Sequence, residues 1–336
     1  MTNISALNLA ALQDCAGAIA AAAALVEDEM RAVESRLAER MESPIGAIPQ
    51  IGAHLLGAGG KRLRPLLAVL AARAADAPFE HGIAVGCAAE LIHTATLYHD
   101  DVVDDGRVRR GRPAARMVFG NGLVVLVGDF CLARALETVA LTGSLHMVRS
   151  LAATVTEMAE GEVAQLERAG NPDASVEEYF RVIDRKTASL IAWCARVGGS
   201  VNESWAAPLD RYGRALGRAF QIADDVLDSA IDEATAGKSV GHDLQEGKLT
   251  LPVLLACEAD PALAARVRGH LGEHGVPAQV VAEILKEVRA AGGVERAQRK
   301  AAALADEAVS ALQALPPSRY RDGLAALAHA SAYRSS

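Results

Sequence analysis

The feature that most constrains the fold is the spacing of the apolar residues, which recur every three to four positions along almost the whole chain. Alanine, leucine, arginine and glutamate fill most windows, aromatic residues make up only 4% of the chain, and alternating β-branched runs are rare. These residue types favour helices, and their spacing gives each helix an apolar face. The sequence therefore predicts an all-α protein.

Clusters of turn-forming residues divide this pattern into segments. They fall at Gly57–Gly60, Asp76–Pro78, Gly106–Pro113, Gly170–Pro172, Ala236–Lys248, Gly272–Pro277 and Pro316–Pro317. The sequence contains no low-complexity linker and no repeat of about 20 to 50 residues, which favours one packed bundle over a repeat array. We predict a single domain over residues 1–336, with helices over 5–41, 44–57, 62–74, 82–104, 114–119, 122–139, 144–168, 175–199, 204–228, 249–256, 260–271, 277–290, 293–314 and 318–332.

Composition excludes several classes of protein. The 34 basic and 42 acidic residues give a net charge of −8, and 51% of the residues are hydrophobic. Disordered chains are less hydrophobic, and proteins that bind nucleic acid usually carry a basic surface, so we expect neither. The five cysteines show no Cys-x-x-Cys spacing, which predicts buried thiols rather than disulfides or a zinc site.

The sequence shows no targeting or membrane segment. The first 14 residues lack a basic region, and the apolar run over 15–26 is closed by two acidic residues. The longest uncharged stretch, over 43–60, contains two prolines and five glycines, which prevent an uninterrupted membrane helix. We expect a cytoplasmic chain without a transmembrane span.

The sharpest local feature is the acidic end of the predicted helix over 82–104, where Asp100 and Asp104 share one face. Like charges one turn apart repel, and carboxylates at a helix C-terminus face the negative end of the helix dipole. A bound Mg²⁺ would compensate these charges, since it takes carboxylate and phosphate oxygens as ligands. A solvated acidic helix end explains one such cluster equally well.

The same Asp-Asp-x-x-Asp pattern recurs at Asp224, Asp225 and Asp228, again at the end of an apolar helix. Two copies favour a paired site, because two facing helices can direct their carboxylates into one cavity that holds several magnesium ions. The predicted metal ligands are Asp100, Asp104, Asp224 and Asp228.

Cationic residues in turns and at helix starts complement these carboxylates. They lie in Gly59–Pro65, at Arg109-Arg110-Gly111, and beside glycine at Lys238 and Lys248. Each alone is compatible with ordinary surface charge, but together they suit a diphosphate, which arginine and lysine commonly bind. Lys186-Thr187 lies inside an apolar helix, and His93 lies two turns before Asp100 on the same face. His93 fits a core histidine and a ligand contact equally well.

Taken together and in this order, the motifs resemble the trans-polyprenyl diphosphate synthase family from about Gly59 to Leu255. The resemblance rests on Gly59-Gly60-Lys61-Arg62-Leu63-Arg64-Pro65, the first aspartate motif with Arg109-Arg110-Gly111, Gly128-Asp129-Phe130, Lys186-Thr187, Phe220-Gln221 with the second aspartate motif, Gly237-Lys238-x-x-Gly241-x-Asp243, and Gly247-Lys248-x-Thr250-Leu251-Pro252.

The resemblance implies an isoprenoid-synthase helical bundle around a deep central cavity, usually a homodimer. Such enzymes condense an allylic diphosphate with successive molecules of isopentenyl diphosphate, using about three Mg²⁺. It implies isopentenyl diphosphate contacts at Lys61, Arg64, His93 and Arg110, and allylic contacts at Arg109, Lys186, Thr187, Gln221 and Lys238, with Lys248 a weaker candidate. The catalytic set it implies is Asp100, Asp104, Asp224 and Lys186, with Asp101 and Asp225 in supporting positions.

The resemblance also bears on product length, since large side chains four and five residues before the first aspartate cap the product tunnel in this family. Here these positions hold Thr96 and Ala95, both small. We therefore expect an open tunnel and a product of about eight isoprene units, as in octaprenyl diphosphate synthases, which a membrane enzyme could then take over. A geranylgeranyl or farnesyl diphosphate synthase, and a non-catalytic regulatory subunit, are the alternatives. Met117, Phe119 and Met158 are candidates for the tunnel floor.

Overall fold

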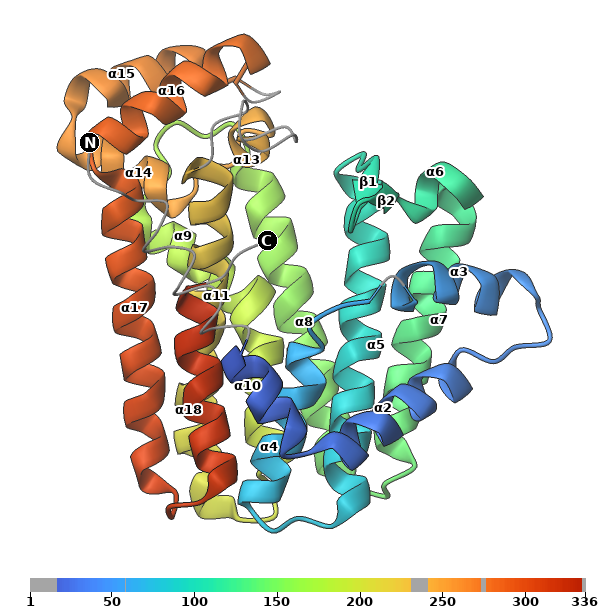
Figure 1. Cartoon of the computed structure of the whole chain (residues 1–336). Coiled ribbons are helices and arrows are strands. Elements are labelled where there is room, and N and C mark those ends of the chain that lie inside the picture. The colour runs from blue at the N-terminus through green and yellow to red at the C-terminus, as the bar shows by residue number, and fades with distance from the viewer. Residues whose placement is uncertain (1–16, 58, 231–240, 273–275, 334–336) are drawn as a thin grey trace.

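The computed structural model describes residues 17–57, 59–230, 241–272 and 276–333 (Figure 1). Helices account for nearly all of this regular structure. The strands found in it, β1 (Val108–Arg109) and β2 (Arg112–Pro113), form one short antiparallel hairpin. The all-α prediction is confirmed.

The first half of the chain builds one side of the molecule. Residues 17–24 are helical. The elements that follow are α2 (Glu27–Arg40), α3 (Ala47–Leu56), α4 (Leu63–Ala74), α5 (Phe79–Val103), the hairpin, α6 (Ala115–Phe119), α7 (Asn121–Ala140) and α8 (Leu145–Arg168). Helix α5 packs along α7 and α4 and also touches α2 and α10, so it lies inside the bundle.

The second half forms the other side. Its elements are α9 (Val176–Ile183), the π-helical turn η1 (Asp184–Ala188), α10 (Ser189–Gly198), the 3₁₀ turn η2 (Glu203–Trp205), α11 (Ala206–Ala230), α13 (His242–Gln245), α14 (Leu251–Ala259), α15 (Pro261–His270), α16 (Ala278–Ala290), α17 (Gly293–Ala311), the 3₁₀ turn η3 (Leu312–Ala314) and α18 (Arg319–Ala332). In Figure 1, α17 and α18 run along one flank, and α15 and α16 cover one end.

Two clusters of buried apolar residues form the core. The larger one surrounds α4, α5 and α10, and the smaller one lies among α11, α14, α16 and α17. Helices α11 and α17 contribute to both, for example through Leu216 and Ile222 of α11. The largest fully buried side chains are Trp193, Tyr98 and Tyr212.

Besides shifts of a few residues at most helix ends, the structure differs from the sequence prediction in the following places. The helix expected over 5–41 bends at Val26, a fully buried residue with extended φ, and residues 1–16 lie outside the described part. The helix expected over 175–199 contains the π-turn η1. The breaks at 106–113 and 236–248 hold the hairpin and the one-turn helix α13. The π-turn packs against distant helices, and such contacts are not reported by local periodicity.

The described cysteines are free thiols, and Cys87, Cys131 and Cys194 are buried while Cys257 is half-buried. Burial raises the pKa of the first three to about 12, which keeps them protonated. Cys15 lies outside the described residues. Among the helices of the described part, none is both long enough and apolar enough to cross a membrane.

Tyr98 fastens α3 to α5, because its buried hydroxyl donates a 2.6 Å hydrogen bond to the backbone carbonyl of Ile51. The change Tyr98→Phe removes the donor and leaves this carbonyl short of a partner in a dry environment. We expect the free energy of unfolding, measured by chemical denaturation, to fall by about 1 kcal/mol. Tyr333→Phe, at a half-exposed tyrosine, is the matched control and is expected to change nothing. Equal effects of both changes would contradict this role of Tyr98.

Candidate active site

Two adjoining hollows contain most of the residues singled out in the sequence. The larger, of about 920 Å³, lies at the C-terminal end of α5, and the smaller has about 340 Å³. The larger hollow is lined by, among others, Asp100, Asp104, Arg109, Arg110, Lys186, Thr187, Gln221, Asp225, Asp243, Glu246 and Lys248. The smaller is lined by Lys61, Arg64, His93 and Arg110 together with Glu90 and Phe220. Arg110 lines both hollows.

Asp100 is the most strongly perturbed carboxyl group of the first motif. Burial raises its pKa to about 6; Lys186 opposes this shift, and Glu162 and Asp104 add to it. The Lys186 ammonium is itself held by α8, at 2.5 Å from the Glu162 carboxylate and 2.7 Å from the side-chain oxygen of Gln165. A cation is thus fixed beside a carboxylate that is poorly hydrated.

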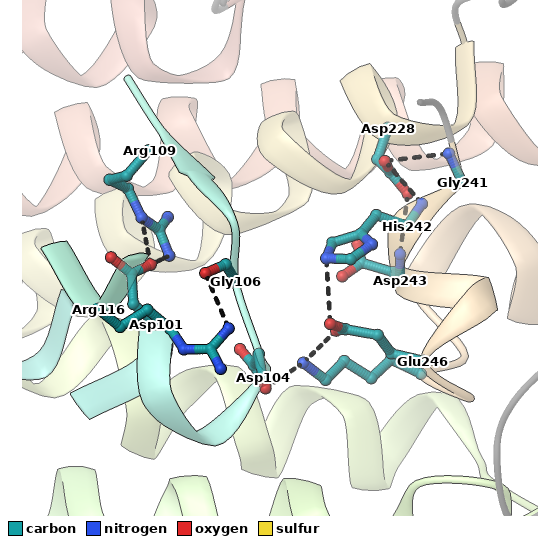
Figure 2. A network of polar contacts seen from close by, with 11 residues as sticks. Asp101, Asp104, Gly106, Arg109, Arg116, Asp228, Gly241, His242, Asp243 and Glu246 are labelled. Carbon is teal, nitrogen blue, oxygen red and sulfur yellow. Dashed lines mark hydrogen bonds and ion pairs between the residues drawn. The ribbon is translucent and has the colours of Figure 1, made fainter. Parts of the chain in front are cut away.

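Asp104 ends α5 and begins a chain of ion pairs across the larger hollow (Figure 2). The Lys248 ammonium lies 3.3 Å from Asp104 and 2.6 Å from Glu246, and His242 lies 3.1 Å from Glu246. Burial acts to raise the pKa of Glu246, but the hydrogen bonds from His242 and Lys248 outweigh it and lower that pKa to about 2. Burial also raises the pKa of Asp243 to about 7, as does the charge of Asp228.

The second motif places its adjacent carboxylates differently. Asp225 is buried and accepts hydrogen bonds from the Tyr179 hydroxyl at 2.5 Å and from the Gln221 amide at 2.9 Å. The Thr187 hydroxyl donates to the Gln221 side-chain oxygen at 2.9 Å. Burial, with the nearby charge of Asp243, holds the pKa of Asp225 well above its usual range. Asp225 therefore supports Gln221 and Thr187.

Asp228 binds the backbone at the start of α13. Its carboxylate accepts from the backbone N–H groups of Gly241, His242 and Asp243 at 3.1 to 3.4 Å, which fixes the start of α13. Asp224 lies one turn earlier on α11 and is half-buried. Neither Asp224 nor Asp228 is among the residues that line the larger hollow.

Arg109 is held in place by a buried carboxylate. Its guanidinium donates twice to Asp101, at 2.6 and 2.9 Å, and Asp101 is 1% exposed. Arg116 braces the same turn by donating to the carbonyl of Gly106 (Figure 2). It also forms a 2.6 Å ion pair with Asp105. The second aspartate of the first motif thus positions an arginine of the turn.

The smaller hollow is built on a left-handed turn. Arg62 has φ 44° and is pinned by Glu90 at 2.8 Å, by Glu34 at 2.6 Å and by the carbonyl of Leu56. Glu90 is itself buried in α5. These contacts hold the turn that carries the neighbouring lysine.

Arg110 closes the smaller hollow by donating to the carbonyls of Leu55 and Gly59. Burial lowers the pKa of His93 well below its usual value, and the charges of Arg64 and Arg110 act in the same direction. His93 is therefore neutral at pH 7 and offers one donor and one acceptor.

The two predicted product-length residues lie on α5, about one turn before Asp100. Ala95 is 4% exposed and belongs to the core, and the Thr96 hydroxyl is bonded to the carbonyl of His93 in its own helix. Lys238 lies outside the described residues. No group of three or more histidine, cysteine, aspartate or glutamate side chains in the described part is gathered closely enough to hold a metal ion.

Several residues of the site were not identified from the sequence, namely Tyr179, Glu162, Gln165 and Glu246. Glu162 and Gln165 lie three residues apart on α8, so they share a face. Two polar side chains on one face of an otherwise amphipathic helix could have been noticed in the sequence as candidates for the site. Tyr179 and Glu246 show none, because they reach the site only through the packing of α9 and α13.

Comparison with known proteins gives one consistent family. The polyprenyl synthetase family model matches residues 46–288. The octaprenyl diphosphate synthase of Escherichia coli (strain K12) is 40% identical over 314 residues, covering 92% of this chain and 97% of that protein. The nonaprenyl diphosphate synthase of Rhodobacter capsulatus, described as geranyl-diphosphate specific, is 34% identical, covering 89% and 93%.

Solved structures agree with these relatives. A polyprenyl synthase from Caulobacter crescentus, crystallised with calcium and isoprenyl diphosphate, superposes with a TM-score of 0.89 at 38% identity, covering 94% of this chain and 98% of that chain. A decaprenyl diphosphate synthase from Rhodobacter capsulatus gives a TM-score of 0.87 at 39% identity, covering 93% and 97%.

Proposed function

The chain belongs to the polyprenyl synthetase family, and on that premise we propose that it is a long-chain trans-prenyltransferase. It adds molecules of isopentenyl diphosphate to an allylic diphosphate and releases pyrophosphate at each step. The observation that carries the proposal is the pair of adjoining hollows, one cationic and one rich in carboxylates, with Arg110 on the wall of both. Two anionic substrates can therefore lie side by side.

The smaller hollow is the proposed site of isopentenyl diphosphate. Lys61, Arg64 and Arg110 supply positive charge there, and the neutral His93 supplies a hydrogen bond. Arginine forks and a lysine ammonium are the usual ligands of diphosphates in proteins. The pinned backbone around Arg62 keeps these donors in place before substrate arrives.

The larger hollow is the proposed site of the allylic diphosphate and Mg²⁺. Its carboxylates fit the metal, because hard cations prefer carboxylate oxygens and the half-buried Asp100 lies near the charges of Asp104 and Glu162. We propose Asp100 and Asp104, which line this hollow, as ligands of Mg²⁺. Asp224 and Asp228 do not line it, and the repeated motif alone supports them as further ligands of about three Mg²⁺. When bound, the metal supplies positive charge to the diphosphate that leaves.

The protein contributes fixed donors where negative charge develops. Arg109 is oriented by Asp101, Lys186 by Glu162, and Thr187 with Gln221 by Asp225. Donors that are already oriented need no reorganisation as the C–O bond of the allylic substrate breaks. The resulting cation is attacked by the double bond of isopentenyl diphosphate, and the proton lost afterwards passes to the released pyrophosphate.

The first test is incubation of the purified protein with Mg²⁺, isopentenyl diphosphate and an allylic diphosphate, with mass analysis of the products. We expect Asp100→Asn to lower kcat by about 100-fold or more at unchanged helix content, because it removes a buried carboxylate from the proposed metal site. Asp173→Asn, at a surface aspartate, is the control and is expected to keep full activity. No product from the wild-type chain with any primer would overturn the proposal and favour a regulatory subunit.

We propose a product of about eight isoprene units. The support is the small size of Ala95 and Thr96, together with the 40% identity to octaprenyl diphosphate synthases. Both side chains lie about one turn of α5 below Asp100, where a growing chain first needs room. Small side chains there leave that room.

Product length can be tested by filling this space. Thr96→Phe is expected to shorten the product to three or four units, and Ala95→Phe to do the same with a loss of stability from overpacking. Ala303→Phe, on the exposed face of α17, is the control and is expected to leave product length unchanged. Unchanged products from both α5 variants would show that the tunnel floor lies elsewhere, and Met158 on α8 would then be examined next.

We propose a homodimer in which α6 and α7 meet the same helices of a second copy. Four large apolar side chains are exposed there, namely Met117, Val118, Leu123 and Leu126. An exposed apolar face that serves both copies is the usual basis of a two-fold dimer.

The dimer is tested by sedimentation at micromolar concentration. Leu126→Glu is expected to give monomers, because Leu126 is 64% exposed and a charge there blocks only a partner. Leu145→Glu, equally exposed at the start of α8, is the control and is expected to stay dimeric. A monomeric wild-type chain would contradict the proposal.

A further inference from the structure

Among the charges around Asp100, that of Lys186 has the largest effect on the pKa of Asp100. Lys186 lies in the only π-helical turn among the described residues. This turn, η1, interrupts what is otherwise a continuous helix from α9 to α10. A π-turn is rare and occurs mostly as a single turn inside an α-helix, frequently at functional sites. Here neighbouring helices make close contacts with it. Two glycines provide such contacts, one on each side of η1.

Gly161 of α8 lies on one side. A Cβ at this position would come within 2.6 Å of the backbone nitrogen of Lys186, 2.8 Å of the Arg185 Cβ and 3.0 Å of the Lys186 Cα. Two of these three atoms are backbone, which cannot swing aside as the end of a side chain can. Only glycine allows α8 to approach this closely.

Gly217 of α11 lies on the other side. A Cβ there would come within 2.6 Å of the Cα of Ala188, the last residue of η1. The first residue, Asp184, is fixed to the same helix by Arg218 at 2.9 Å and by Arg214 at 3.6 Å. Both ends of η1 are thus seated against α11.

Both glycines lie in the interior of long helices, where glycine costs about 1 kcal/mol relative to alanine. The close packing that the two glycines allow brings the side chains of η1 into contact with both neighbouring helices. Lys186 reaches Glu162 and Gln165 on α8, while the adjacent Thr187 reaches Gln221 on α11, and both line the larger hollow. The wider turn lets neighbouring residues serve the same cavity.

We propose that Gly161 and Gly217 are positioning residues, which seat the π-turn so that Lys186 and Thr187 face the diphosphate in the larger hollow. The proposal rests on the function proposed above and deepens it. According to this proposal, the position of the Lys186 side chain is determined by the close approach of α8 at Gly161, not by the helix that carries the lysine.

Gly161→Ala is the direct test. The added methyl displaces the backbone of Lys186, and a misplacement of about 1 Å can lower a rate by about 100-fold. We expect kcat/KM for the allylic diphosphate to fall by about that factor, with the KM for isopentenyl diphosphate unchanged, since the smaller hollow does not include η1. Simple loss of folded enzyme would instead lower the apparent kcat and leave both KM values unchanged, so a raised KM for the allylic diphosphate distinguishes a positioning effect.

Gly269→Ala is the matched control. Gly269 also lies in a helix, α15, but a Cβ there meets nothing within 4 Å. Its kinetics are expected to equal those of the wild type. A comparable loss in this variant would overturn the proposal, because the effect would then follow from any helical glycine.

A double-mutant cycle separates positioning from a general structural effect. If Gly161 acts through Lys186, the variant Gly161→Ala/Lys186→Ala will be no slower than Lys186→Ala alone. Multiplied losses would overturn the inference. If Gly161→Ala does not fold, as judged by helix content, Gly217→Ala enters the same cycle with the same two outcomes. An active wild type with multiplied losses refutes only the positioning role, whereas an inactive wild type refutes the proposed function.

Discussion

The site depends on keeping buried carboxylates charged at the end of α5. Burial raises the pKa of Asp100 to about 6, and the charges of Lys186 and Arg109 act against this shift and favour the ionised form. The compensating charges come from separate elements: Lys186 from η1, Arg109 from the hairpin and Lys248 from the segment after α13. Charge balance therefore ties together parts of the chain that are far apart in sequence.

The Asp-Asp-x-x-Asp motif contains residues with different tasks, because adjacent residues on a helix point in different directions. In the first motif Asp100 faces the hollow while Asp101 turns away to hold Arg109. In the second, Asp225 holds Gln221, and Asp228 caps α13. The repeated pattern places carboxylates in one region but does not make them equivalent.

The helices and most of the charged residues lining the two hollows could be predicted from the sequence, since apolar periodicity and the order of the motifs are local signals, whereas Tyr179, Gln165 and Glu246 of the larger hollow could not. The π-turn around Lys186 could not, because the helices that pack closely against it through Gly161 and Gly217 are distant in sequence. Nor could the contact between Tyr179 and Asp225, which depends on how α9 packs. The family resemblance placed Asp101 and Asp225 in supporting positions, whereas Tyr179, Glu162 and Gln165, which hold other side chains of the site, are defined by tertiary contacts and were missed.

Helix α5 also limits how product length can vary. It is buried on nearly all sides and packs against α4, α7 and α10, so its backbone is a fixed wall of the bundle. Ala84, Ala88, Ala89 and Ala95 keep side chains small along it. Close-packed interiors respond to a change of volume through the side chains in contact. On the proposed function, space for a longer product therefore depends on the size of side chains on α5, such as Ala95, and of those that face it, rather than on movement of the helix, which would also displace Asp100.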